Sequence, residues 1–320
     1  MSVTTTRAQV IDSFGAADRL HPAELPLVAP GVGQVQIRVA AAAVNPVDLT
    51  TRAGRNIPAQ DARFPMVIGW DAAGTVEQLG DGVEGWAVGD RVAAMTFQPL
   101  DQNGTYTQYL NLAADLLARV PDGLTLERAA TIPLAGLTAS QLVRSVDLAP
   151  GATLLVNGPL GAVGRLVVQL ARREGVTVVA VVKPADRGAV LELGAAEVVD
   201  RGEFTAVVPR LHPGGVDAAV DLVGGVTAHA TLASVRDGGA YTTSVPQYMD
   251  PTGAFEPERG IRFQLQTVHP DTPELTDLLQ AAERGELTTA VERTYPLTEA
   301  AQAHDRQEQG GLRGKLILIP

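Results

Sequence analysis

Short extended segments, broken by Gly and Pro, fill the first 120 residues of the chain. Residues 35–44, 73–80 and 90–97 are apolar runs, and clusters of turn-forming residues stand at 80–85 and 87–90. Apolar runs bounded in this way are typical of β-strands. We therefore expect an all-β, barrel-like unit in this part of the chain.

Beyond Pro121 the periodicity changes, and residues 126–146 have helical spacing. Predicted strands follow at 153–157, 177–182, 196–200, 217–225, 240–245 and 315–319. Predicted helices lie at 162–175, 185–194, 227–239, 273–287 and 296–311. Apolar, β-branched strands that alternate with helices indicate βαβ units and a buried parallel sheet. The fold class is therefore α/β, a doubly wound parallel sheet beside a β-barrel.

Composition narrows the functional classes. The chain has 320 residues, 45% of them hydrophobic and 19% charged, which suits a globular protein of two domains. A net charge of −11 argues against nucleic acid or an anionic membrane surface as the partner. The chain has no Cys, which excludes disulfides, a thiolate nucleophile and Cys-ligated zinc. The first residues lack the apolar core of a signal peptide and no apolar run approaches ~18 residues, so we expect a cytoplasmic protein.

The segment 154–164, LLVNGPLGAVG, carries the clearest chemical signal. A predicted strand leads through Gly158, Gly161 and Gly164 into a predicted helix. Such glycines permit a tight turn, close approach of the backbone to a pyrophosphate, and close packing of helix on strand. The helix N-terminus, including Ala162 and Val163, offers N–H groups to phosphate. A tight turn without a ligand is the alternative.

The next predicted strand ends at Lys183, where NAD-binding proteins usually carry the Asp or Glu that binds the ribose 2′-hydroxyl. Arg187 follows one helical turn later, and Arg201 follows the third strand. Cations without a carboxylate suit a 2′-phosphate, so the pattern favours NADPH over NADH. Alternatively these are ordinary solvated charges, and the nearby Asp186 weakens the argument.

Several segments together resemble a known family. The motifs are NPVDLTTRAG (45–54), FPMVIGWDAAGTVEQLGDGVEGWAVGDRV (64–92), GTYTQYL (104–110), LAGLTA (134–139), NGPLGAVG (157–164), LGAAEVVD (193–200), DLVGG (221–225), PLTEAAQAH (296–304) and GKLIL (314–318). In this order they resemble the medium-chain dehydrogenase/reductase superfamily, in its zinc-free quinone oxidoreductase (zeta-crystallin-like) branch. The resemblance implies a GroES-like β-barrel catalytic domain over 1–120, closed by 290–320. It also implies a Rossmann NADP-binding domain over 121–289, with the active site in the cleft between the two. Relatives are often homodimers that associate through the edge of the Rossmann sheet.

The resemblance also implies that no zinc is bound. Zinc-dependent members use a Cys three residues before an Asp and the His of a Gly-His-Glu segment. Here Asn45 precedes Asp48 by three residues, and Trp70 stands in Gly69-Trp70-Asp71. Neither side chain makes a plausible zinc ligand. Without metal, hydride delivery to an electron-poor quinone or enone is the easier reaction, because its oxyanion needs only hydrogen-bond donors.

Candidate site residues follow from the same resemblance. Asn45 would bond the substrate oxygen or the nicotinamide ribose, unless it only caps a turn. Asp48 would order the loop, and Thr138 would contact the nicotinamide unless its hydroxyl bonds to its own helix. Strand ends at Val223, Gly224, Ser244 and Val245 would contact cofactor, with simple packing as the alternative.

Other residues are expected to be structural. Trp70 is better explained as a packed aromatic than as a platform for quinone. His304 is expected to be structural, and the five His residues show no metal-binding spacing. The stretch after Asn45 lacks the Tyr that many relatives use, so water or a ribose hydroxyl would supply the proton.

The leading hypothesis is an NADPH-dependent reductase that transfers hydride to a quinone or an α,β-unsaturated carbonyl. One alternative is a non-catalytic NADPH-binding redox sensor, because neither a metal site nor a general acid is evident. Another is an enoyl-thioester reductase, which the acidity of the chain disfavours because a carrier or coenzyme A would need a basic groove.

Overall fold

The computed structural model describes residues 4–245 and 259–320. The chain divides into two compact units. The first, which we call the barrel unit, comprises Met1–Leu134 and His269–Pro320, and the second, the Rossmann unit, comprises Ala135–Val268. No helix in the described ranges has the length and apolarity needed to cross a membrane.

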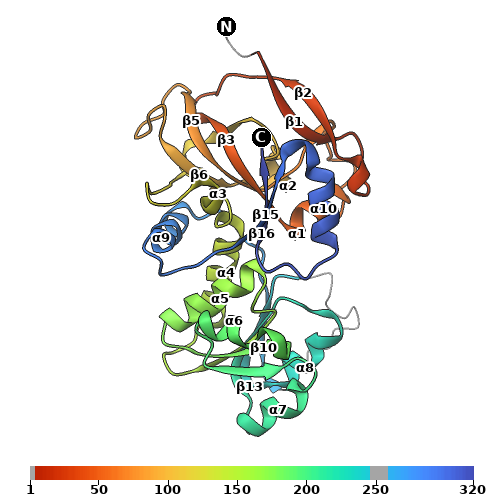
Figure 1. Cartoon of the computed structure of the whole chain (residues 1–320), viewed down its shortest axis with the longest axis vertical. Coiled ribbons are helices and arrows are strands. Elements are labelled where there is room, and N and C mark those ends of the chain that lie inside the picture. Colours follow the sequence, from red (N-terminus) through yellow and green to blue (C-terminus); the bar gives the residue numbers. More distant parts are fainter. Residues whose placement is uncertain (1–3, 246–258) are drawn as a thin grey trace. The chain divides into compact units, whose positions relative to one another are not determined.

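The barrel unit is built on mainly antiparallel sheets, as the turn-rich pattern predicts (Figure 1). A seven-stranded sheet has the order β15-β16-β3-β5-β6-β8, with β7 also pairing with β3, and a smaller sheet has the order β2-β1-β4. The strands are β1 (Thr5–Ile11), β2 (His21–Pro26), β3 (Gln34–Val44), β4 (Met66–Val67), β5 (Asp71–Leu79), β6 (Arg91–Met95), β7 (Tyr109–Ala113), β8 (Ala118–Arg119), β15 (Val291–Pro296) and β16 (Lys315–Ile319). The helices are α1 (Pro46–Arg52), α2 (Gln98–Asp101), α3 (Leu126–Ala129), α9 (Thr272–Glu283) and α10 (Ala300–Glu308).

The strand β16 joins the N-terminal and C-terminal parts of this unit. It pairs antiparallel with β3, with Leu316 opposite Val44 and Ile317 opposite Ala43, and parallel with β15. Leu316, Ile317 and Leu318 are fully buried. The same register sets Asp71 of β5 opposite Ala43. The first residues of β5 and β16 therefore lie beside the end of β3, where Asn45 follows.

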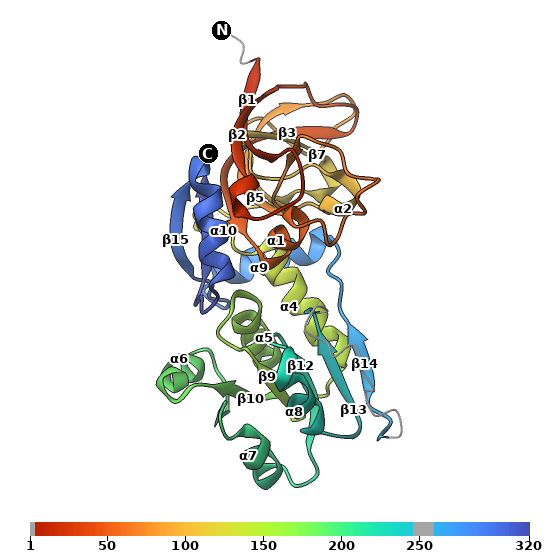
Figure 2. The ribbon, with the colours of Figure 1, turned by 90° about the vertical axis from the view of Figure 1, so that its right-hand side faces the viewer.

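The Rossmann unit contains a six-stranded parallel sheet with the order β11-β10-β9-β12-β13-β14 (Figure 2). Its strands are β9 (Thr153–Asn157), β10 (Thr177–Val182), β11 (Glu197–Asp200), β12 (Val216–Asp221), β13 (Val235–Thr243) and β14 (Arg262–Leu265). Its helices are α5 (Ala162–Arg173), α6 (Arg187–Glu192), α7 (Phe204–Leu211) and α8 (Ala228–Ala233), and α4 (Pro133–Val146) leads into it from the barrel unit. The strand order reverses between β9 and β12, which is where ligands bind in open α/β sheets.

The observed units differ from the expected domain boundaries at two stretches, 121–134 and 269–289, which lie in the barrel unit rather than with the Rossmann domain. Their contacts explain this placement. Helix α9 packs against β8, and α3 packs against β3 and β5. In addition, the Gly123 backbone N–H donates to Glu283 Oε1 at 3.0 Å.

Three predicted helices differ from the structure. The helical pattern over 126–146 is divided into α3 and α4, with Pro133 at the start of the second helix, where a missing N–H costs least. The predicted helix 296–311 is shorter, because a 3₁₀ turn (Leu297–Glu299) precedes α10. The prediction for 227–239 is wrong beyond Ala233, because β13 begins at Val235. Here a Cβ on Gly239 would lie 2.6 Å from the Asp217 carbonyl oxygen, so a side chain would prevent the close approach of β13 to β12.

Replacing Ile317 by Ala tests the role of β16. We expect a loss of about 2–5 kcal/mol in the free energy of unfolding, because the side chain is fully buried and leaves a cavity. Chemical denaturation of the full chain measures it. The matched control is Ile319→Ala in the same strand, where the side chain is only partly buried. An equal or larger loss in the control would contradict the central role of β16.

Candidate active site

Asn45, Asp71 and Lys315 form a buried cluster at the end of the barrel unit's central strands. The Asn45 Nδ2 donates to Asp71 Oδ2 at 2.9 Å, and the Lys315 ammonium donates to Asn45 Oδ1 and lies 3.5 Å from Asp71 Oδ2. All three side chains are at most 5% exposed. The second oxygen of Asp71 accepts the backbone N–H of Leu134 at 2.7 Å, at the start of α4. Asp71 thus joins β3, β16 and α4 through one carboxylate.

These contacts fix the orientation of the Asn45 amide. Lys315 only donates and the Asp71 carboxylate only accepts, so a flipped amide would face each with the wrong group. The amide nitrogen also donates to the Ala43 carbonyl oxygen at 3.3 Å, which uses its second proton. The side chain therefore has no donor left, and Oδ1 keeps one acceptor position.

Burial governs the titration of this cluster. It raises the pKa of Asp71 above its usual range, although the Lys315 charge opposes the shift. Burial likewise lowers the pKa of Lys315, with the two nearby carboxyl groups acting against it. The ion pair compensates part of the desolvation cost that each charge would carry alone.

Asp48 lies in the first turn of α1 and is completely buried. Its Oδ2 accepts the Asn45 backbone N–H at 2.7 Å and the Tyr106 hydroxyl at 2.9 Å. Burial raises the pKa of Asp48 to about 7, although both hydrogen bonds favour the charged form. These are the contacts of a residue that orders the turn at Asn45.

Trp70 is packed in the barrel unit rather than presented at a surface. It is 3% exposed, its ring meets Phe97 edge-on at 5.4 Å between centroids, and its Nε1 donates to Thr51 Oγ1 at 3.3 Å. An indole offers no lone pair to a metal, and the Asn45 amide is already bonded on both sides. The residues at these two family ligand positions therefore do not fit zinc. Within residues 4–245 and 259–320, no group of three or more His, Cys, Asp or Glu could hold a metal ion.

The glycines of the Rossmann unit form a compact turn at the switch point of the sheet. Gly158 has φ of +87°, which favours glycine. A Cβ on Gly164 would lie 2.1 Å from the Gly158 carbonyl oxygen, so helix and strand approach too closely for any side chain. Gly161 is the N-cap of α5, and a Cβ there would find its nearest atom at 3.7 Å. Gly161 is exposed and could carry a side chain at ordinary van der Waals distance, and Ala162 and Val163 at the N-terminus of α5 are partly exposed.

The predicted 2′-phosphate ligands differ in their surroundings. Lys183 and Arg201 are exposed and follow the neighbouring ends of β10 and β11, where Val182 is opposite Asp200. The backbone N–H of Arg201 donates to the Val182 carbonyl at 2.7 Å, which keeps the two positions together. Arg187 is also exposed, but its Nη1 donates to the Val198 carbonyl at 3.2 Å. Lys183 and Arg201 are thus the better placed pair.

Asp221, at the end of β12, holds the turn that contains Val223 and Gly224. Its Oδ1 accepts the backbone N–H groups of Val223 and Gly224, each at 2.9 Å, and Asn157 Nδ2 at 3.1 Å. Its Oδ2 accepts the Tyr241 hydroxyl at 2.8 Å. Because Asn157 directly precedes Gly158, one buried carboxylate connects the two turns.

Other predicted cofactor residues lie in the same unit. Thr138 on α4 is 4% exposed, and its Oγ1 has no hydrogen-bond partner in the described part of the chain, so the structure does not show the expected alternative bond to its own helix. Ser244 and Val245 follow β13, and the Val245 N–H donates to Thr243 Oγ1 at 3.1 Å. Their contacts with a cofactor stay predictions.

Sequence reasoning missed Lys315, Tyr106 and Asp221 as members of these clusters. A lysine that opens the apolar run KLILI was a usable signal, because a charge in a buried strand needs a partner. Tyr106 carried no such local signal, because its partners Asp48 and His304 come from distant segments. Asp221 in the segment DLVGG did carry one, because an Asp before a turn can accept the N–H groups that follow it, here those of Val223 and Gly224.

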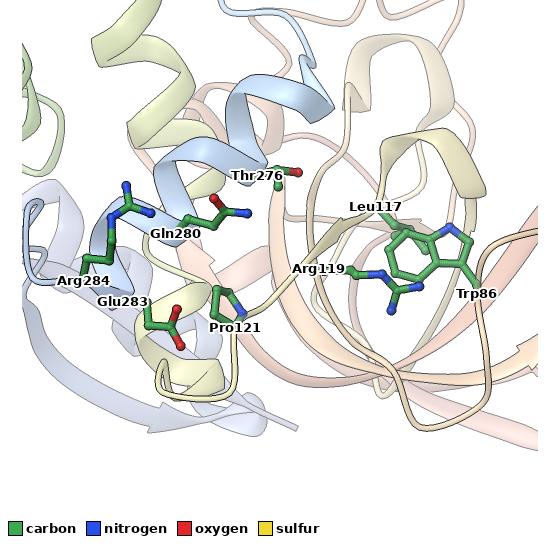
Figure 3. Close-up of a pocket in the computed structure, with 8 residues that line it drawn as sticks. All are labelled: Trp86, Leu117, Arg119, Pro121, Thr276, Gln280, Glu283 and Arg284. Atoms are coloured by element: carbon green, nitrogen blue, oxygen red, sulfur yellow. The ribbon is translucent and has the colours of Figure 1, made fainter.

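A separate groove lies on the barrel unit, between α9 and the segment around β8 (Figure 3). Its volume is about 610 Å³. It is lined by Trp86, Leu117, Arg119, Pro121, Thr276, Gln280, Glu283 and Arg284. None of the predicted site residues lines this groove, so it does not mark the site that the sequence indicates.

Asp48→Asn should change how stability depends on pH. The Asp48 carboxyl group ionises near 3.8 in an unfolded chain and near 7 in the folded protein. Between these values the folded state binds one more proton, so its stability relative to the variant falls as pH rises. The variant should gain about 1.4 kcal/mol per pH unit relative to the native protein between those limits, and nothing above them.

Urea unfolding of both proteins from pH 4 to pH 8.5 measures this difference. The buried His304, whose pKa burial lowers to about 3, contributes the opposite slope in both proteins and cancels. A flat difference curve would show that Asp48 ionises normally.

Gly164→Ala should destabilise the Rossmann unit by more than about 2 kcal/mol, because the new methyl group would overlap backbone atoms. Gly161→Ala is the matched control three residues away, with φ of −66° and its nearest neighbour at an ordinary 3.7 Å, and should cost about 0.5 kcal/mol. Thermal unfolding of the two variants decides the point. Equal stability would mean that the close approach at Gly164 is not rigid.

Comparison with known proteins gives the family. Residues 31–122 match the model of the alcohol dehydrogenase GroES-like domain, and residues 193–318 match a model described as zinc-binding dehydrogenase. The chain is 31% identical to a 2-haloacrylate reductase from Burkholderia sp., over 98% of each chain. Its fold is similar to that of a quinone oxidoreductase from Coxiella burnetii, with a TM-score of 0.89, 26% identity and coverage of 99% of each chain. A mycobacterial protein solved in complex with NADPH gives a TM-score of 0.84 at 30% identity, over 98% of this chain and 100% of that one. The chain belongs to the medium-chain dehydrogenase/reductase superfamily, in its zinc-free quinone oxidoreductase-like branch.

Proposed function

We propose that this protein is a zinc-independent, NADPH-dependent oxidoreductase that transfers hydride to a quinone or an α,β-unsaturated carbonyl compound. The observation that carries the proposal is the turn from Gly158 to Gly164, which leaves no room for a side chain at Gly164 and leaves Gly161, the N-cap of α5, exposed. Relatives named as a quinone oxidoreductase and a 2-haloacrylate reductase support the acceptor class. Both kinds of acceptor are conjugated and electron-poor.

The residues of the Rossmann unit fit a nicotinamide dinucleotide. The N–H groups of α5 would bind the pyrophosphate, because helix N-termini attract anions. Lys183 and Arg201 would bind a 2′-phosphate at the neighbouring strand ends, with Arg187 in support. The buried, unpartnered Thr138 hydroxyl would bond a polar group of the nicotinamide, and Val223, Gly224, Ser244 and Val245 would line the strand ends. When bound, NADPH supplies the hydride.

The barrel unit contributes orientation rather than a metal. The amide protons of Asn45 are already used by Asp71 and Ala43, so Asn45 does not stabilise an oxyanion. Its Oδ1 keeps one acceptor position, which suits a hydroxyl group such as that of a ribose. Of the two partners considered for Asn45, the ribose is therefore favoured over the substrate oxygen. Lys315 and Asp71 hold the amide in this orientation.

Acceptor-dependent oxidation of NADPH tests the proposal. The purified protein should oxidise NADPH with a quinone or an enone, and added zinc or chelator should leave the rate unchanged. Cofactor binding measured in parallel by fluorescence distinguishes the alternatives. Binding without turnover across a broad acceptor panel would favour a redox sensor, and activity restricted to crotonyl thioesters would favour an enoyl-thioester reductase.

Lys183→Ala and Arg201→Ala should each weaken NADPH binding about tenfold, because each removes one charge-assisted hydrogen bond to the 2′-phosphate. The affinity for NADH, which lacks this phosphate, should not change. Arg210→Ala removes an exposed cation from α7 in the same unit and serves as the control. Equal losses of affinity for NADPH and NADH would show that these cations act through general electrostatic attraction and do not bind the 2′-phosphate.

A further inference from the structure

A chain of buried polar groups runs through the barrel unit and ends at Asp48. The Arg52 Nη1 lies 3.1 Å from His304 Nδ1, and His304 Nε2 lies 3.1 Å from the Tyr106 hydroxyl. The Tyr106 hydroxyl is 2.9 Å from Asp48 Oδ2. Its members are at most 3% exposed, and they come from α1, α10 and the segment before β7. At its outer end Arg52 Nη2 meets Glu308 Oε1 at 2.5 Å, and the Glu308 side chain is 48% exposed.

The chemistry of Arg52 and Asp48 sets the direction of donation along this series of hydrogen bonds. A guanidinium group only donates hydrogen bonds, so His304 Nδ1 must be the accepting nitrogen. His304 is neutral, because burial and Arg52 lower its pKa to about 3, and its proton is therefore on Nε2. His304 then donates to the Tyr106 oxygen, and Tyr106 donates to Asp48. Every bond points from Arg52 toward the carboxylate.

A chain of this kind cannot carry protons inward. Passing a proton to Asp48 would require His304 to take one from Arg52, whose guanidinium does not release protons in proteins. This series of hydrogen bonds therefore stabilises the charge of the Asp48 carboxylate and does not transfer protons to it. The Tyr106 hydroxyl is one of two donors to Asp48, and the other is the Asn45 backbone N–H, so Tyr106 acts on the same turn as Asn45.

We propose that Tyr106, oriented by His304 and Arg52, is a positioning residue that favours the ionised form of Asp48 and so holds the Asn45 turn. The inference rests on the proposed function, because it assigns Asn45 to the site. The groups that face Asp48 are Tyr106, the Asn45 N–H, Asp71 of β5 and Lys315 of β16. Protonation of Asp48 would weaken both bonds that it accepts, so activity should fall as pH drops through the midpoint of Asp48.

Tyr106→Phe tests this inference, because it removes only the hydroxyl. The native protein should lose kcat below a midpoint near pH 7, and the variant should show the same loss with its midpoint about one pH unit higher. The same shift should be seen in the free energy of unfolding, which needs no turnover. The Asp48→Asn variant is subtracted from the native protein, and the Tyr106→Phe/Asp48→Asn double variant from Tyr106→Phe. The midpoint of the second difference curve should lie about one pH unit above that of the first.

Thr107→Val is the matched control. The Thr107 hydroxyl is also buried, but it bonds Thr6 Oγ1 at 3.0 Å and backbone oxygens rather than Asp48. Both midpoints should stay at their native values in this variant. Unchanged midpoints in Tyr106→Phe would overturn the inference, even if its kcat were lower.

A second pair of variants applies if Tyr106→Phe does not fold. His304→Gln keeps one donor and one acceptor and should hold the midpoint of the stability curve, whereas His304→Leu should raise it. The same midpoint for both would overturn the inference. A native protein without turnover on any acceptor would contradict the proposed function alone, because the stability curves still decide the role of Tyr106.

Discussion

The buried carboxylate of Asp71 sets the constraint on which the barrel unit depends. A charge without solvent must find its full set of partners within the protein, and Asp71 finds them in Asn45, Lys315 and the first turn of α4. Each partner comes from a different part of the chain. The position of β16 between β3 and β15 is thus tied to electrostatics as well as to apolar packing.

The Rossmann unit repeats this solution with Asp221. Asp71 begins β5 and Asp221 ends β12, and each accepts a side-chain amide and at least one backbone N–H. In each unit the acid bonds to a turn, at Asn45 or at Val223 and Gly224, that lies outside the hydrogen bonds of the sheet. A carboxylate suits this task because it accepts several hydrogen bonds at once and each is charge-assisted. The predicted site residues Asn45, Val223 and Gly224 each donate a hydrogen bond to one of these acids.

The sequence predicts the parts of the fold that depend on local pattern. The Rossmann strands β9 to β12 and helix α5 are continuous apolar runs with clear glycine punctuation, and the structure confirms them. Strands β1 and β15 contain few apolar residues, although β1 is mostly buried, and pattern alone does not reveal them. The predicted Asn45 and Asp48 lie in one cluster, but their partners Lys315 and Tyr106 are 270 and 58 residues away and follow only from strand register. Tertiary pairing, rather than periodicity, decides such contacts.

The connectivity of β16 has a consequence for biosynthesis. The strand that carries Lys315 is translated after the entire Rossmann unit, whereas Asn45 and Asp71 are translated before it. Until Lys315 arrives, the nascent barrel holds two acids, Asp48 and Asp71, with no cation to compensate them, and cannot bury them at low cost. The Rossmann unit is therefore translated in full before the barrel unit has its complete set of charged partners. A chain that ended before Lys315 would lack both this cation and the strand that pairs with β3 and β15.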